Sequence, residues 1–163
     1  EKVRSYTNYG RGHPADSELV GGINSRLDAI QAAFLGYLLP HLDAWNCRRR
    51  EIAESYLSVI PPTGPVLTPL HWDLEASVWH HFVVLAEDRL ALEQHMSHLG
   101  IPTMRHYGIT AAEQFRIVNG GSRTGDFPIA EQIAGQGVSL PMNPWLTENQ
   151  VDRVCDALKQ FLA

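Results

Sequence analysis

The sequence predicts an α+β fold in which helices pack on a small sheet, and three observations carry that prediction. Between residues 26 and 59, apolar residues recur at spacings of three and four, which is typical of amphipathic helices. Residues 77–86 are rich in valine and aromatic side chains and are too few for a helix between their flanks, which predicts a central strand. Helical and strand patterns then follow one another without a linker or an internal repeat, so we expect one domain with an irregular lead-in.

The first half of this pattern has clear start and stop signals. A helix is predicted from Arg26 to Pro40, and a second helix follows at once because proline is tolerated in a first turn. The proline- and glycine-rich stretch at residues 61–65 ends that second helix. After the strand, Asp88 caps a helix that ends at Gly100, the residue type that best accepts a left-handed conformation.

The second half predicts shorter elements. Strands are expected at residues 101–107 and 137–142, with helices over residues 110–118 and from Pro128 between them. Thr147, followed by a glutamine three residues later, has the form of a capping box and begins the last helix.

Residues 1–22 mix Gly, Pro, Asn, Asp and Ser with little periodicity, which indicates a loop that packs on something else. The chain starts at Glu1 rather than at a methionine, and no basic-then-apolar signal precedes it. We therefore expect a piece of a longer polypeptide.

Composition and charge narrow the classes of function. The formal net charge of −5 and the scattered arginines argue against a nucleic-acid surface. No apolar run approaches the roughly 20 residues that a bilayer crossing needs. Cys47 and Cys155 lack a Cys-x-x-Cys spacing, which is typical of reduced cysteines in a cytoplasmic protein. The chain is thus predicted to be cytoplasmic, with neither nucleic acid nor a membrane as its partner.

The stretch "GGINSRLDAIQAAFL" at residues 21–35 carries more polar groups than a helix start requires. Asn24, Ser25 and Arg26 could simply cap the following helix. Alternatively, an amide, a guanidinium and the free N–H groups of a helix start together suit a phosphate, and the preceding glycines allow close approach. The residues themselves leave both readings open.

Eight histidines raise the question of a metal site. His95 and His98 are three apart on a predicted helix, whereas His80 and His81 are neighbours that should point to opposite faces of a strand. No carboxylate or cysteine completes a ligand set, so no metal site is predicted. No catalytic triad, P-loop or dinucleotide fingerprint is present either, so these motifs alone leave the function open.

Several separate blocks resemble one family. "GGINSRLDAIQAAFL", "LLPHLDAWNCRRREIAESY", "VWHHFVV", "GIPTMRHY" and "FPIAEQIAGQGVSLPMNPWLTENQV" are similar, in order and spacing, to the C-terminal part of the DegT/DnrJ/StrS sugar aminotransferases. The resemblance implies the small C-terminal domain of a fold-type I pyridoxal 5'-phosphate (PLP) enzyme, with helices on a small, mostly antiparallel sheet. Residues 1–22 would be a lead-in loop bordering the active site, and residues 23–163 the small domain with its connecting helices.

The resemblance also implies an activity and its participants. Such enzymes usually act as homodimers and convert a keto group on a nucleotide-linked sugar into an amine, with glutamate as the usual donor. Asn24 would reach across the dimer interface to the PLP phosphate of the partner subunit. The sugar would be bound by five residues: Tyr9, Arg11, His13, His106 and Tyr107.

The chain departs from the family pattern after Tyr107, where Gly108 and Thr110 replace prolines and Ala112 replaces a histidine. It also lacks the lysine that such an enzyme needs to hold PLP covalently and to move protons. Lys2 and Lys159 are its two lysines, and neither lies in the family's lysine context.

We therefore predict no catalytic residue in these 163 residues and no activity of the chain alone. The alternative is a noncatalytic binding or regulatory module derived from the family. The upstream coding sequence discriminates between the two, because an enzyme requires the lysine motif there.

Overall fold

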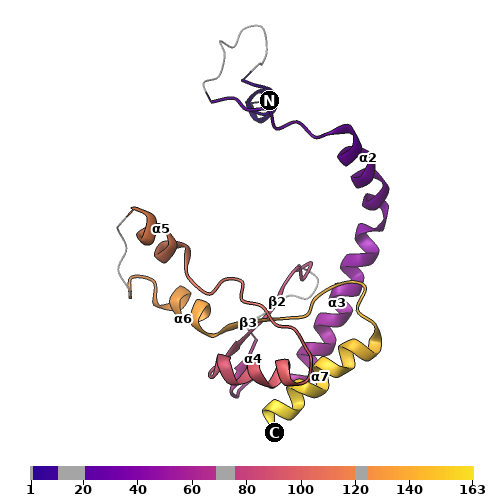
Figure 1. The fold of residues 1–163 in the computed structure, drawn as a ribbon. Helices are drawn as coiled ribbons and strands as arrows, with labels where there is room; N and C mark the ends of the chain where they lie inside the picture. Colours follow the sequence, from indigo (N-terminus) through magenta and orange to yellow (C-terminus); the bar gives the residue numbers. More distant parts are fainter. Residues whose placement is uncertain (1, 11–20, 69–75, 120–124) are drawn as a thin grey trace. The chain divides into compact units, whose positions relative to one another are not determined.

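A computed structural model of the chain describes residues 2–10, 21–68, 76–119 and 125–163 (Figure 1). The chain splits into two compact units, Glu1–Leu42 and Asp43–Ala163, and each is described here by itself. The predicted division into residues 1–22 and 23–163 concerns the roles of the segments and stays a prediction.

The first unit contains a short helix, α1 (Lys2–Tyr6), a longer helix, α2 (Ala29–Leu38), and a 3₁₀ turn, η1 (Leu39–His41). The helix α1 lies where the sequence predicted only loop. The helix α2 begins three residues later than predicted, because Asp28 is its cap: the Asp28 carboxylate accepts a hydrogen bond of 2.8 Å from the Ile30 N–H.

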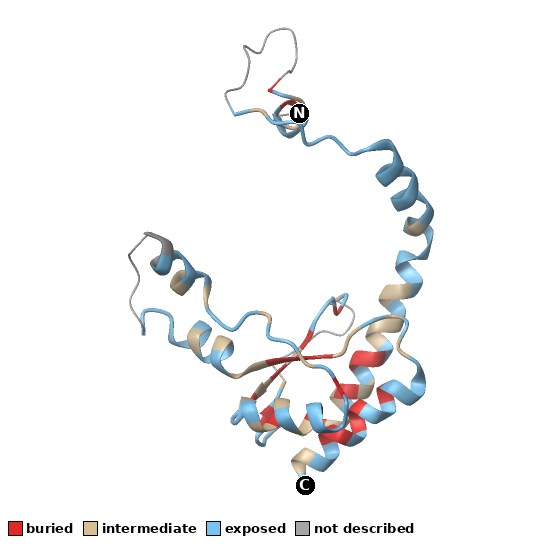
Figure 2. Cartoon of the chain, in the orientation of Figure 1, coloured by how far each residue is buried: buried red, intermediate tan, exposed pale blue. Residues whose placement is uncertain are grey.

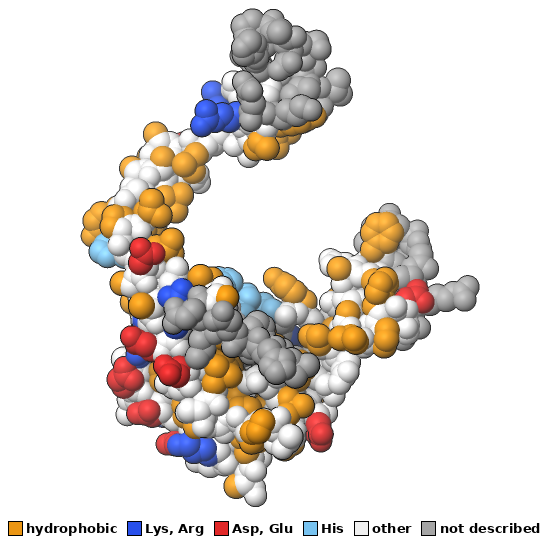
Figure 3. Space-filling view, turned by 180° about the vertical axis from the view of Figure 1, so that it is seen from behind, with side chains coloured by type: hydrophobic (Ala, Val, Ile, Leu, Met, Phe, Trp, Pro, Cys, Tyr) orange, Lys and Arg blue, Asp and Glu red, His pale blue; other side chains and the backbone are white. Residues whose placement is uncertain are grey.

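The apolar side chains of α2 are exposed. None of its residues is buried, as Figure 2 shows. The exposed fraction is 80% for Ile30 and 63% for Phe34, and apolar side chains also lie open on the surface in Figure 3. The predicted helix exists, but no described part of this unit covers its apolar residues.

The second unit has a three-stranded antiparallel sheet with strand order β1-β2-β3, and this confirms the predicted fold class. Its elements in chain order are α3 (Leu42–Val59), β1 (Val66–Leu67), β2 (Phe82–Ala86), α4 (Arg89–His98), α5 (Ala111–Asn119), α6 (Pro128–Gln136), β3 (Gly137–Leu140) and α7 (Glu148–Leu162).

One face of the sheet forms the core with α3, α4 and α7 (Figure 2). Alternate residues of each strand point to the same face, so Val84 of β2 and Val138 of β3, which are register partners, share this face and are fully buried. The helices contribute large buried side chains, among them Ile52, Tyr56, Leu92, Met96 and Leu158. Val83 and Ser139, the next register pair, consequently point to the opposite face.

The three predicted strands differ from the observed ones, and the one predicted at 137–142 ends at Leu140. The strand predicted at 77–86 is shorter and begins at Phe82. Residues 101–107 form no strand; Met104 alone pairs with Ser139, through two backbone hydrogen bonds of 2.7 and 3.1 Å. Pro102 has no N–H to extend the pairing, and a turn follows Arg105.

The capping box of the last helix is confirmed, with the Thr147 hydroxyl accepting from the Gln150 N–H and the Gln150 side chain accepting from the Thr147 N–H. Within the described ranges, no helix combines the length and the apolar character that a bilayer crossing demands.

Candidate functional site

Asn24 lies in the first unit on an extended segment that pairs with the turn after α1. Ile23 N–H donates to Tyr6 O at 2.8 Å, Ser25 N–H donates to Thr7 O at 2.9 Å, and Asn24 forms an isolated bridge with Asn8.

Gly22 is required where this segment meets the turn. A Cβ atom at residue 22 would lie 2.0 Å from the backbone nitrogen of Gly10, far inside van der Waals contact. The glycine thus allows the close approach predicted from the sequence, although the partner is the protein's own backbone rather than a ligand.

The capping hypothesis for Asn24 and Ser25 is wrong, because Asp28 caps α2. The same observation changes the phosphate hypothesis. The Asp28 carboxylate lies at the helix start and accepts from the Ile30 N–H, and its negative charge there disfavours a second anion at that helix start. What remains for an anion is the pair of side chains before the helix, Asn24 and Arg26.

These two side chains are arranged together. The Arg26 Nε–H donates to Asn24 Oδ1 at 3.2 Å, and the Arg26 guanidinium lies 5.9 Å from the centre of the Tyr9 ring. Because this bond uses the acceptor of the amide, it orients the Asn24 Nδ2 donors away from Arg26. Tyr9, Arg26 and Asn24 therefore form one exposed polar group, and its donors suit an anionic oxygen.

His106 and Tyr107 lie in the second unit, beside the sheet face opposite the core. The His106 Nδ1 atom is 2.9 Å from Ser139 Oγ. The His81 ring stacks on the His106 ring with centroids 4.0 Å apart and an interplanar angle of 20°, and the Tyr107 ring meets His106 edge-on at 5.5 Å. A cavity of about 300 Å³ adjoins the group, lined partly by His81, His106 and Ser139.

The histidines influence one another electrostatically. Burial lowers the pKa of His81, and the nearby His106 and His80 imidazoles lower it further. The His80 and His81 rings lie 4.3 Å apart, against the expectation that they point to opposite faces, because both residues precede β2 instead of lying on it. At neutral pH, His81 is thus a neutral ring that stacks on His106.

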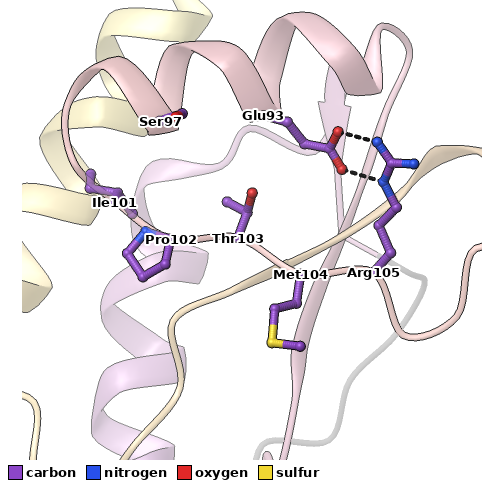
Figure 4. A pocket seen from close by; sticks show the side chains of 7 residues that line it. All are labelled: Glu93, Ser97, Ile101, Pro102, Thr103, Met104 and Arg105. Atoms are coloured by element: carbon purple, nitrogen blue, oxygen red, sulfur yellow. Dashed lines mark hydrogen bonds and ion pairs between the residues drawn. The ribbon is translucent and has the colours of Figure 1, made fainter.

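A second cavity of about 620 Å³ is lined by α4 and by the segment that leads to His106, and Figure 4 shows the side chains around it. Glu93 of α4 accepts two hydrogen bonds from the Arg105 guanidinium, at 2.6 and 2.5 Å, and Arg105 directly precedes His106. The Arg105 side chain, chiefly through these bonds, holds the pKa of Glu93 below its ordinary value. This ion pair holds the segment at residues 101–105 against α4.

Of the predicted site residues, the structure brings His106 and Tyr107 together in one unit, and it gives Tyr9 and Asn24 a common partner, Arg26, in the other. Arg11 and His13 lie outside the described residues.

Ser139, His81 and Glu93 were not among the site residues predicted from the sequence. A serine within the apolar stretch "GVSLPM" was the available signal for Ser139. No group of three or more His, Cys, Asp or Glu side chains in the described part of the chain is placed to hold a metal ion. Lys159 lies on α7 and pairs with Asp156 at 3.1 Å.

Comparison with known proteins gives a consistent result. The chain is 36% identical over 159 residues to the erythromycin biosynthesis sensory transduction protein EryC1 of Saccharopolyspora erythraea, covering 98% of this chain and 43% of that protein. It is 38% identical over 162 residues to a dTDP-3-amino-3,6-dideoxy-alpha-D-galactopyranose transaminase of Aneurinibacillus thermoaerophilus, covering 99% of this chain and 43% of the transaminase.

Among solved structures, DesV of S. venezuelae superposes with a TM-score of 0.87 at 36% identity, over 99% of this chain and 43% of DesV. The chain thus spans less than half the length of these relatives. Residues 1–159 match the sequence pattern of one family. The chain belongs to the DegT/DnrJ/EryC1/StrS aminotransferase family.

Proposed function

We propose that this chain is the C-terminal part of a PLP-dependent aminotransferase that transfers an amino group from glutamate to a keto group of a nucleotide-linked sugar. The enzyme would work as a homodimer in the cytoplasm. The observation that carries the proposal is the similarity to a sugar transaminase along 99% of the chain. The activity of the whole enzyme requires a part that the 163 residues do not contain, since they lack a lysine in the family's context.

The polar group around Asn24 fits the phosphate of PLP. A phosphate needs convergent N–H donors, and Asn24 Nδ2 and the Arg26 guanidinium supply them on an exposed segment. The bond from Arg26 keeps the Asn24 amide in the donating orientation. In the proposed homodimer, Asn24 would bind the phosphate of the partner subunit's PLP. When bound, PLP acts as the electron sink for amino transfer.

The nucleotide-linked sugar would be bound by Tyr9, Arg11, His13, His106 and Tyr107. His106 supports this role best, since its ring adjoins a cavity of about 300 Å³ and no described residue bonds its Nε2 atom. Tyr107, with 76% of its surface exposed, can supply a phenol oxygen beside it.

The test is made in the protein encoded by the whole reading frame. Asn24→Ala should weaken PLP retention by about 1–3 kcal/mol, the range for a hydrogen bond to a charged group. Equilibrium dialysis against PLP, followed by its absorbance, measures the change. Asn149→Ala, an exposed asparagine on α7, is the matched control and should leave PLP retention unaltered. Equal PLP affinities of the Asn24→Ala variant and the wild-type protein would remove Asn24 from the site.

A noncatalytic module remains the second candidate, and one observation favours it: the S. erythraea relative is named for sensory transduction. The reading frame separates the candidates. An upstream segment that contains the lysine motif, with amino transfer from glutamate to a nucleotide-linked keto sugar by the purified product, supports the enzyme. A start codon directly before Glu1 supports the module.

A further inference from the structure

The His106 ring is fixed from three directions by its own chain. Ser139 bonds its Nδ1 atom, His81 covers one face, and the Tyr107 ring packs roughly perpendicular to it. A ring held in this way presents its remaining nitrogen, Nε2, in one direction. In the neutral imidazole, Nε2 is a hydrogen-bond donor if the ring proton lies on it and an acceptor if the proton lies on Nδ1. The contact with Ser139 decides between these two tautomers.

Ser139 is itself held firmly. Only 5% of its surface is exposed, and it lies in β3 opposite Val83 of β2. Its backbone N–H and C=O both bond Met104, two residues before His106. The sheet thus sets the position of Ser139 Oγ, and the Met104 bridge brings the His106 segment to it.

The direction of the hydrogen bond follows from the surroundings of the hydroxyl. In the described part of the chain, the His106 imidazole is the hydrogen-bond partner found for Ser139 Oγ. If Ser139 donates its O–H to Nδ1, the buried hydroxyl proton is satisfied. If Nδ1–H donated to Ser139 instead, the serine proton would need a second acceptor, and burying it without one is costly. The donating arrangement is favoured, and it leaves the ring proton on Nε2.

We propose that Ser139 is a positioning residue that selects the His106 tautomer with its proton on Nε2, so that this N–H donates to an oxygen atom of the nucleotide-linked sugar. Only the donation from Nε2–H to the sugar rests on the proposed function. His81 supports the arrangement by stacking on one face of the His106 ring.

The first experiment uses the 163-residue chain and needs no ligand. In long-range ¹H–¹⁵N spectra recorded above the histidine pKa range, the His106 ring should show an unprotonated Nδ1 and a protonated Nε2. In Ser139→Ala, the Nδ1 and Nε2 shifts should move toward the average of the two tautomers. Ser139→Thr, which keeps a hydroxyl, should restore the wild-type pattern, and Ser97→Ala on α4 should leave it unaltered. A wild-type proton on Nδ1, or identical His106 shifts in Ser139→Ala, overturns the inference.

The second experiment uses the product of the whole reading frame. Ser139→Ala should raise KM for the nucleotide-linked sugar about 3- to 10-fold, the range for one lost hydrogen bond, with kcat altered less than about 2-fold. Ser139→Thr should recover most of the loss. If the spectra show the Nε2–H tautomer but KM for the sugar is unaltered, then His106 does not bind the sugar. That result contradicts the proposed substrate role and the last step of this inference, but not the amino transfer itself.

Discussion

A single hydrogen bond between α3 and the end of β3 provides a sharp test of the described core. The Tyr56 side chain is fully buried, its ring packs edge-on against Phe82 at 5.2 Å, and its hydroxyl donates to Pro141 O at 2.9 Å. Burial raises the pKa of the Tyr56 phenol, so the hydroxyl is protonated and can donate at neutral pH. Tyr56→Phe removes this donor and keeps the ring.

The magnitude follows from what is left behind. Losing a buried hydrogen bond and leaving its acceptor unsatisfied costs about 1–3 kcal/mol. Pro141 is only half-buried, so water can reach its carbonyl group in part. We therefore expect the lower part of that range, so that Tyr56→Phe lowers the free energy of unfolding by about 1–2 kcal/mol. For a chain of this size, this corresponds to a Tm lower by about 2–8 °C.

Urea unfolding followed by tryptophan fluorescence measures this change, since Trp79 stacks on Phe82 at 5.4 Å and reports on the same core. Tyr37→Phe is the matched control, because Tyr37 on α2 is 73% exposed and its substitution should alter the free energy of unfolding by less than about 0.5 kcal/mol. If Tyr56→Phe and Tyr37→Phe unfold at the same urea concentration, the hydrogen bond to Pro141 does not stabilise the fold and this account of the core is wrong.

Two further predictions concern the segments that carry the site. Glu93→Gln should destabilise the second unit at neutral pH. Because Arg105 lowers the folded-state pKa of Glu93, the stabilisation is present above the unfolded pKa of about 4.3 and is lost as the pH falls through the folded value. The urea midpoints of Glu93→Gln and wild-type protein should therefore converge in acid, and a gap that is independent of pH contradicts the ion pair. Asp28→Ala should cost α2 about 1 kcal/mol and lower the helical signal in circular dichroism, whereas Asn24→Ala should not; equal effects would return Asn24 to the helix cap.

The sequence predicted the elements whose signals are local. The period of α3 and the capping box at Thr147 depend on residues within a turn or two, and both appear as expected. The strand predicted at 101–107 failed because pairing depends on distant partners, and only Met104 finds one. The start of α2 was misplaced since several polar residues could serve as its cap, and only the structure shows that Asp28 does.

Less of the candidate site than of the fold could be predicted from the sequence. Family resemblance singled out His106, but the residues that hold it are distant in sequence: Ser139 is 33 positions away, and His81 was considered only as a possible metal ligand. Nothing in the spacing of these residues indicates that Met104 would bridge to β3 and bring them together. A buried serine in an apolar strand was the one local hint.

The two faces of the sheet carry different kinds of residue. Val138 and Leu140 point into the core, and Ser139 between them points to the face where His106 and His81 lie. Substitutions on that second face remove few apolar contacts, so they should affect the orientation of His106 more than the free energy of unfolding. Tyr56→Phe should lower the free energy of unfolding more than it affects the orientation of His106. The reason is that Tyr56 lies in the core and bonds Pro141, the residue that follows β3. A fold arranged in this way can change the residues on its second face while its helices and core stay the same.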